Sequence, residues 1–122
     1  LGPGIKERFE MADKITEEEY QNAKKIRQSV CNRMDEILGE NSVFLIPTAP
    51  VIAPLISTPA NELETFRQNT MALTCISGLT GVPQITMPVS EYSGCPIGLS
   101  IIGKRRTDKM LLKLASEITR KL

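Results

Sequence analysis

Few side chains in this sequence could carry acid–base or nucleophilic chemistry. The chain of 122 residues has no His, so by itself it cannot build a Ser-His-Asp triad, a Cys-His dyad or a His-ligated zinc or haem site. Cys31, Cys75 and Cys95 form no CxxC pair, which excludes a zinc ribbon and a thioredoxin-type motif. We therefore expect no metal and no cofactor, and we interpret the cysteines as reduced, buried thiols of a cytoplasmic protein.

One serine–lysine pair has a spacing that could be considered for acyl transfer. Ser100 and Lys104 are four residues apart, and a catalytic Ser–Lys dyad needs hydrogen-bond reach and a desolvated lysine. Gly103 lies between them at the end of an expected strand, so the two side chains do not share a helix face. The GxSxG, Ser-x-x-Lys, GxGxxG and P-loop patterns do not occur. We therefore name no catalytic residue in this chain.

The charged residues are unevenly distributed although the net charge is only +1. Residues 104–122 carry a basic excess that begins with Lys104, Arg105 and Arg106, a cluster that could contact nucleic acid. The five aromatic residues are scattered singly and offer no stacking platform, so we interpret the cluster as a solvated turn and expect no nucleic-acid partner. The apolar runs are too short to span a membrane. Residues 41–103 hold only four charged residues, Glu62, Glu64, Arg67 and Glu91. So few charges in 63 residues indicate that this segment is buried on most sides.

The elements that must position these side chains begin with a long helix. Thr16 and Glu19 have the spacing of a capping box, and apolar residues recur every three or four positions as far as Gly39, so we predict a helix over Glu17–Leu38. The apolar run 43–46 predicts a strand buried on both faces. A proline-rich loop follows and leads into a second helix, with Pro59 expected at its first position.

The second helix is expected to end before Gly81, and its uncharged half, 71–79, is expected to be buried. The apolar segments 84–89 and 97–102 flank a short polar turn and predict an antiparallel hairpin, followed by a final helix that starts at Thr107. A strand–helix–strand order implies parallel pairing, so we predict an α/β fold with helices packed on part of a mixed β-sheet. Three short strands leave two open edges, which indicates a portion of a larger sheet.

Three motifs together resemble the C-terminal part of the amidase signature family. The first is Ile-Pro-Thr-Ala-Pro at 46–50, the second is the glycine- and proline-containing stretch 74–88, and the third is the stretch 95–103, which ends in Ile-Ile-Gly. Each motif alone is weak, but their order and spacing are specific, and the resemblance covers nearly the whole chain. It implies that residues 1–122 are the C-terminal portion of an amidase domain, with the missing sheet supplied by the rest of that fold.

Family members hydrolyse or transfer linear amides with a Ser–cis-Ser–Lys triad. The resemblance implies that this triad lies upstream, because no stretch here matches the lysine or the Gly/Ser-rich signature that carries it. The chain is therefore expected to be inactive alone. Its implied partners are the remainder of the amidase chain and a small-molecule amide substrate.

The resemblance also implies a set of substrate-binding residues. They are Thr48 in the proline loop and Arg67, Thr70, Met71 and Thr74 in the second helix, segments similar to those that line the acyl side of amidase sites. Arg67 either contacts substrate or pairs with a carboxylate of the missing part, and we favour pairing. The amidotransferase relatives that make Gln-tRNA usually carry an acidic residue near 70–71, and its absence favours a small-molecule amidase.

Two other classes of function remain open. An amidase-like scaffold without catalysis could serve as a binding or receptor module. Alternatively, the chain could be a self-contained interaction domain that closes its sheet by forming a homo-oligomer through an edge strand.

Overall fold

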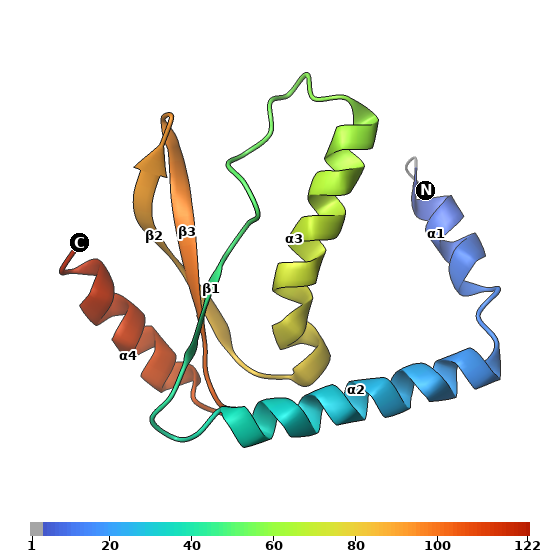
Figure 1. The fold of residues 1–122 in the computed structure, drawn as a ribbon, viewed down its shortest axis with the longest axis horizontal. Coiled ribbons are helices and arrows are strands. Elements are labelled where there is room, and N and C mark those ends of the chain that lie inside the picture. Colours follow the sequence, from blue (N-terminus) through green and yellow to red (C-terminus); the bar gives the residue numbers. More distant parts are fainter. Residues whose placement is uncertain (1–3) are drawn as a thin grey trace.

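The computed structural model describes residues 4–122 and has the α/β composition that the sequence predicts (Figure 1). A short helix that the expected order did not include precedes the long one. The elements are α1 Ile5–Ala12, α2 Glu17–Ile37, β1 Phe44–Pro47, α3 Ala60–Thr80, β2 Gln84–Tyr92, β3 Cys95–Ile102 and α4 Asp108–Thr119.

The three strands form a sheet in the order β1-β3-β2, and both pairings are antiparallel. Phe44 and Gln84 both lie opposite Ile102, so β3 separates β1 from β2. The predicted hairpin is confirmed, but the predicted parallel pairing of β1 with β2 is wrong. The hairpin places β3 directly against β2, and β1 then joins the free edge of β3. The strands of residues 4–122 therefore do not form a mixed sheet among themselves.

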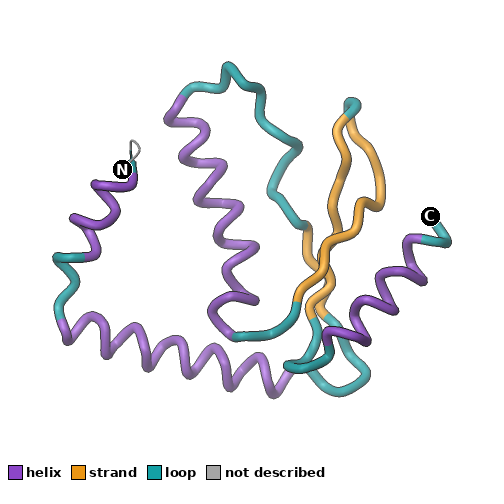
Figure 2. The backbone as a smooth tube through the Cα atoms, turned by 180° about the vertical axis from the view of Figure 1, so that it is seen from behind, coloured by secondary structure: helices purple, strands orange, loops and turns teal. Residues whose placement is uncertain are grey.

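Helices cover the two faces of this sheet unequally (Figure 2). Ile101 and Ile102 point to opposite faces because successive strand residues alternate. The Ile101 side packs with Met87 against Leu111 and Ala115 of α4. The Ile102 side packs against the C-terminal end of α2 and the residues that follow α3, through Met34, Leu38 and Val82.

The capping box at the start of α2 is confirmed. The Glu19 N–H donates to Thr16 Oγ1 at 3.2 Å, and the Thr16 N–H donates to Glu19 Oε2 at 2.8 Å. The Thr16 backbone and hydroxyl donors together hold the pKa of the Glu19 carboxyl below its ordinary value of 4.5.

Replacing this cap should destabilise α2 in a pH-dependent way. Thr16→Ala should lower the free energy of unfolding near neutral pH by about 1 kcal/mol, because it removes one side-chain cap. The Glu19 pKa is lowered in the folded state, so its contribution is present above the unfolded pKa and lost as pH falls through the folded pKa. The loss should therefore shrink in acid. Urea unfolding of wild type and Thr16→Ala, near neutral pH and in acid, measures this loss of unfolding free energy, and Glu18→Gln is the control. A loss that is larger in acid than near neutral pH would contradict the account.

Several segments expected to be buried are exposed in residues 4–122. The uncharged half of α3 leaves Met71 61% exposed, and Thr80 is the buried residue of this helix. Leu45 of β1 is 59% exposed, and Cys75 and Cys95 are half-buried whereas Cys31 is buried. The expectations of a buried α3 half and of a strand covered on both faces are thus wrong for the described residues, because α2 and α4 reach only part of the surface.

Both ends of α3 can be compared with the prediction. The helix ends before Gly81, which has a left-handed φ of 71° that glycine adopts without strain. Its start differs by one residue, because Pro59 has an extended ψ of 148° and is the N-cap rather than the first helical residue.

Candidate functional site

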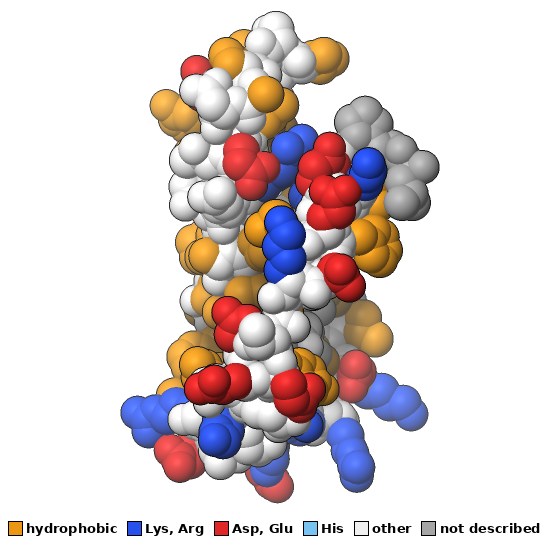
Figure 3. All heavy atoms as spheres, turned by 90° about the vertical axis from the view of Figure 1, so that its right-hand side faces the viewer, with side chains coloured by type: hydrophobic (Ala, Val, Ile, Leu, Met, Phe, Trp, Pro, Cys, Tyr) orange, Lys and Arg blue, Asp and Glu red, His pale blue; other side chains and the backbone are white. Residues whose placement is uncertain are grey.

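The proline-rich loop after β1, the first half of α3 and the far end of the hairpin border a half-open cavity of about 680 Å³. In Figure 3, hydrophobic side chains lie at the top and along the middle of the view, and charged side chains are concentrated in its middle and lower parts. Prolines fix φ along the loop, so this wall keeps its shape with few backbone hydrogen bonds. None of the lining residues is charged: Pro47, Ala49, Pro50, Val51, Ile52, Ala53, Pro54, Phe66, Tyr92, Pro96, Ile97 and Gly98.

A group of three hydroxyls lies next to this cavity, although Thr48, Thr86 and Ser100 are not among its lining residues. Thr48 Oγ1 is 2.8 Å from Ser100 Oγ, and Ser100 Oγ is 2.9 Å from Thr86 Oγ1, so the group joins the start of the proline-rich loop to β3 and β2. Thr48 lies between two lining residues of the loop and directly beside Gly98. A Cβ at Gly98 would approach Thr48 Oγ1 to 2.9 Å, so glycine leaves the space that this threonine occupies.

Ser100 does not meet Lys104. Ser100 is fully buried within the hydroxyl group, whereas Lys104 Nζ lies 3.6 Å from Glu40 Oε1. This geometry agrees with the sequence-based interpretation that Ser100 and Lys104 are not a catalytic pair. A nucleophile–base pair is therefore not formed by these two residues.

The four predicted site residues of α3 lie outside the lining of the cavity. Thr70 donates to the Phe66 carbonyl at 2.8 Å and Thr74 donates to the Thr70 carbonyl at 2.9 Å, so both hydroxyls bind their own helix. Met71 is exposed. The Arg67 guanidinium lies 3.5 Å from Glu64 one turn earlier, in an exposed pair.

The cavity includes residues that the sequence analysis did not name as site residues. Phe66 lies one helical turn before Thr70, and Tyr92 lies at the end of the hairpin. Phe66 could have been predicted as a cavity residue from its position in the second helix, close to the predicted site residues. Tyr92 gave no local signal, because its approach to the proline loop depends on the order of the strands.

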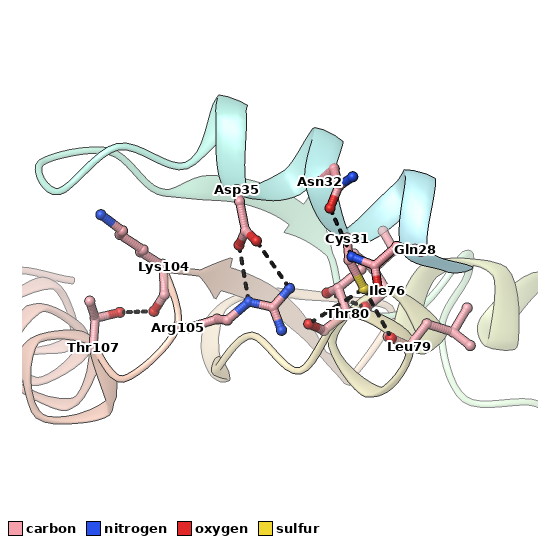
Figure 4. Close-up of polar contacts among 10 residues, drawn as sticks. All are labelled: Gln28, Cys31, Asn32, Asp35, Ile76, Leu79, Thr80, Lys104, Arg105 and Thr107. Atoms are coloured by element: carbon pink, nitrogen blue, oxygen red, sulfur yellow. Dashed lines mark hydrogen bonds and ion pairs between the residues drawn. The ribbon is translucent and has the colours of Figure 1, made fainter. Parts of the chain in front are cut away.

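A second polar cluster joins α2 to the end of α3 and to the turn before α4 (Figure 4). The Arg105 guanidinium donates to both carboxylate oxygens of Asp35, at 3.0 and 3.3 Å, and this contact raises the pKa of Arg105. Arg27 donates to the Leu79 carbonyl at 2.7 Å, and the buried Cys31 thiol faces the same carbonyl. These contacts give the cluster a structural role in joining three segments.

Over residues 4–122, no group of three or more Cys, Asp or Glu side chains is arranged to hold a metal ion. No helix in the described part of the chain is long and apolar enough to cross a membrane.

Comparison with known proteins decides the family. The sequence model of the family described as Amidase matches residues 1–112. The chain belongs to the amidase family. It is 30% identical over 118 residues to Amidase 1 of Arabidopsis thaliana, covering 97% of this chain and 28% of that protein. It is 29% identical over 119 residues to Amidase 1 of Oryza sativa subsp. japonica, covering 97% of this chain and 27% of that protein.

A solved structure shows the same fold. A crystal structure of an amidase superposes with a TM-score of 0.82 at 24% identity, covering 100% of this chain and 29% of the amidase. This amidase-family chain therefore spans less than a third of the length of the relatives it matches. The predicted resemblance to the amidase signature family is confirmed.

Proposed function

We propose that this chain is the C-terminal, substrate-binding portion of an amidase that hydrolyses the carbon–nitrogen bond of a linear small-molecule amide. In this proposal the Ser–cis-Ser–Lys triad belongs to the rest of the protein. The serine attacks the amide carbonyl and is acylated, the lysine relays protons through the second serine, and backbone N–H groups hold the oxyanion. The observation that carries the proposal is the uncharged cavity between the proline loop and α3 of an amidase-family chain.

The chemistry of the cavity favours a neutral, apolar acyl group in the substrate. A charged acyl group would lose its hydration without gaining a counter-charge from the lining residues. Phe66 and Tyr92 offer aromatic surface to a flat or extended apolar group. Phenylacetamide is therefore a suitable probe, and glutamine, with its two charged groups, is the matching polar amide.

Shortening Phe66 should weaken substrate binding at this cavity. In the full gene product, Phe66→Ala should raise KM for phenylacetamide about tenfold with little change in kcat, because a packing contact is made equally in the ground and transition states. Initial rates of ammonia release measure both constants. Phe9→Ala, on exposed α1 outside the cavity, is the matched control. An unchanged KM in Phe66→Ala would count against this cavity as the acyl site.

Several apolar side chains on α2, β1 and α3 are exposed in this chain and form surfaces on which another part of the protein could pack. Ile26 of α2, Leu45 of β1 and Met71 of α3 are each more than half exposed. We propose that the remainder of the amidase chain packs on these surfaces, since the relatives are more than three times longer than the matched segment. We further propose a cytoplasmic protein, because the three cysteines are free in the structure.

A further inference from the structure

We propose that Thr48, Ser100 and Thr86 form a hydroxyl relay that presents one oriented hydrogen-bond donor to an oxygen atom of the amide substrate. In this relay Ser100 is a positioning residue and does not itself touch the substrate. The inference rests on the proposed function, because it assigns a polar role at the edge of the same cavity. It adds two residues, Ser100 and Thr86, to which the family resemblance gave no role.

Counting protons limits the relay to two directions. The Ser100 side chain is fully buried, and its Oγ lies 2.8 Å from Thr48 Oγ1 and 2.9 Å from Thr86 Oγ1. A buried hydroxyl that keeps its single proton unbonded is costly, so Ser100 donates to one threonine and accepts from the other. The relay we propose takes the direction in which Thr86 donates to Ser100 and Ser100 donates to Thr48, because Thr48 lies between two lining residues of the cavity. Thr48 then keeps its own proton for another acceptor.

The remaining contact within the group does not hold that proton strongly. Thr48 Oγ1 and Thr86 Oγ1 are 3.4 Å apart, well beyond the usual O–H···O separation of about 2.7–2.8 Å. A substrate oxygen at normal distance would therefore be the better acceptor. Thr48 is half-buried, Thr86 is exposed and Ser100 is fully buried. The two threonines are therefore accessible, whereas Ser100 lies on the inner side of the group.

The backbone fixes the relay at the edge of the cavity. The Thr48 N–H donates to the Gly98 carbonyl at 3.0 Å, and Thr86 lies directly opposite Ser100 in the sheet register. Gly98 lines the cavity, and its missing side chain leaves Thr48 beside it. Apolar pockets orient their ligands with a few placed polar groups, and a donor of fixed direction beside this uncharged cavity meets that need.

The test uses the full gene product with phenylacetamide, hexanamide and glutamine as probes and ammonia release as the readout. Thr48→Val keeps the shape of the side chain and removes its hydroxyl, whereas Thr48→Ser keeps the hydroxyl. We expect Thr48→Val and Ser100→Ala to raise KM about tenfold with kcat changed less than about twofold, and Thr48→Ser to restore KM to within about twofold of wild type. Thr119→Val, which removes a hydroxyl bonded within α4, should leave both constants unchanged.

The outcomes separate the relay from the proposed function. A wild-type protein that hydrolyses none of the three amides overturns the proposed function, and the relay falls with it. An active wild type overturns the relay alone if Thr48→Val and Ser100→Ala lower the melting temperature but leave KM unchanged. Thr48→Ala is the reserve variant if either of these does not fold, because Thr48 is only half-buried. A wild-type KM in a folded Thr48→Ala protein would also overturn the relay.

Discussion

Replacing Ile101 with alanine should lower the free energy of unfolding by about 3–4 kcal/mol. Ile101 has no exposed surface and lies on β3, the middle strand, with hydrogen-bonded neighbours on both sides. It packs with Met87, Leu111 and Ala115, so the cavity left by the lost atoms cannot close without moving the hairpin or α4. Urea unfolding of the chain measures the change.

Leu45→Ala is the matched control for this change. Leu45 lies directly opposite Ile101 in the sheet register but is mostly exposed, so its truncation should cost less than about 1 kcal/mol in the chain alone. Similar losses for the two variants would contradict the packing described for β3. A larger Leu45→Ala loss in the full gene product than in the chain would support the proposal that the remaining amidase chain covers β1.

A methyl group added at Gly103 should also destabilise the protein, by about 1–3 kcal/mol. A Cβ there would lie 2.7 Å from Thr107 Oγ1 and 3.0 Å from Leu111 Cδ2. Leu111 is buried, and the Thr107 hydroxyl donates to the Lys104 carbonyl at 2.6 Å, so neither side chain moves freely. Gly103→Ala should therefore shift the start of α4 away from β3, and its urea midpoint should fall.

Gly78→Ala should stabilise the protein, in contrast to Gly103→Ala. Gly78 lies within α3 and nothing lies within 4 Å of the added Cβ, so alanine should stabilise the helix by about 0.5–1 kcal/mol. The two variants make the same chemical change at positions that differ in the available space. A midpoint that falls by the same amount in both would show that contact with the added methyl does not decide the effect.

Local features of the fold were predictable from the sequence because neighbouring residues determine them. The capping box of Thr16 and Glu19, the end of α3 at Gly81 and the β2–β3 hairpin each depend on a short stretch of chain. The place of β1 depends on which edge of the hairpin is free, and this is a long-range property that no local pattern encodes. The parallel pairing was therefore predicted wrongly although each strand was found.

The burial of apolar residues was less predictable for a similar reason. Apolar composition indicated that the uncharged half of α3 and both faces of β1 are covered, but Met71 and Leu45 are exposed in this chain. Apolar composition indicates that a residue favours burial, but it does not indicate which segment of the protein packs against that residue. The same applies to the site, where Thr48 could be named from its motif but its contact with Ser100 and Thr86 required the strand order.

The most direct test of the central claim compares ammonia release from phenylacetamide by the full gene product and by the chain of residues 1–122. The account predicts hydrolysis by the full product and none by the chain, because residues 4–122 bring no serine–base pair to the cavity and the proposed triad lies elsewhere. Hydrolysis by the chain alone, at a rate comparable to that of the full product, would contradict the assignment of this chain as a substrate-binding portion without its own catalytic residues.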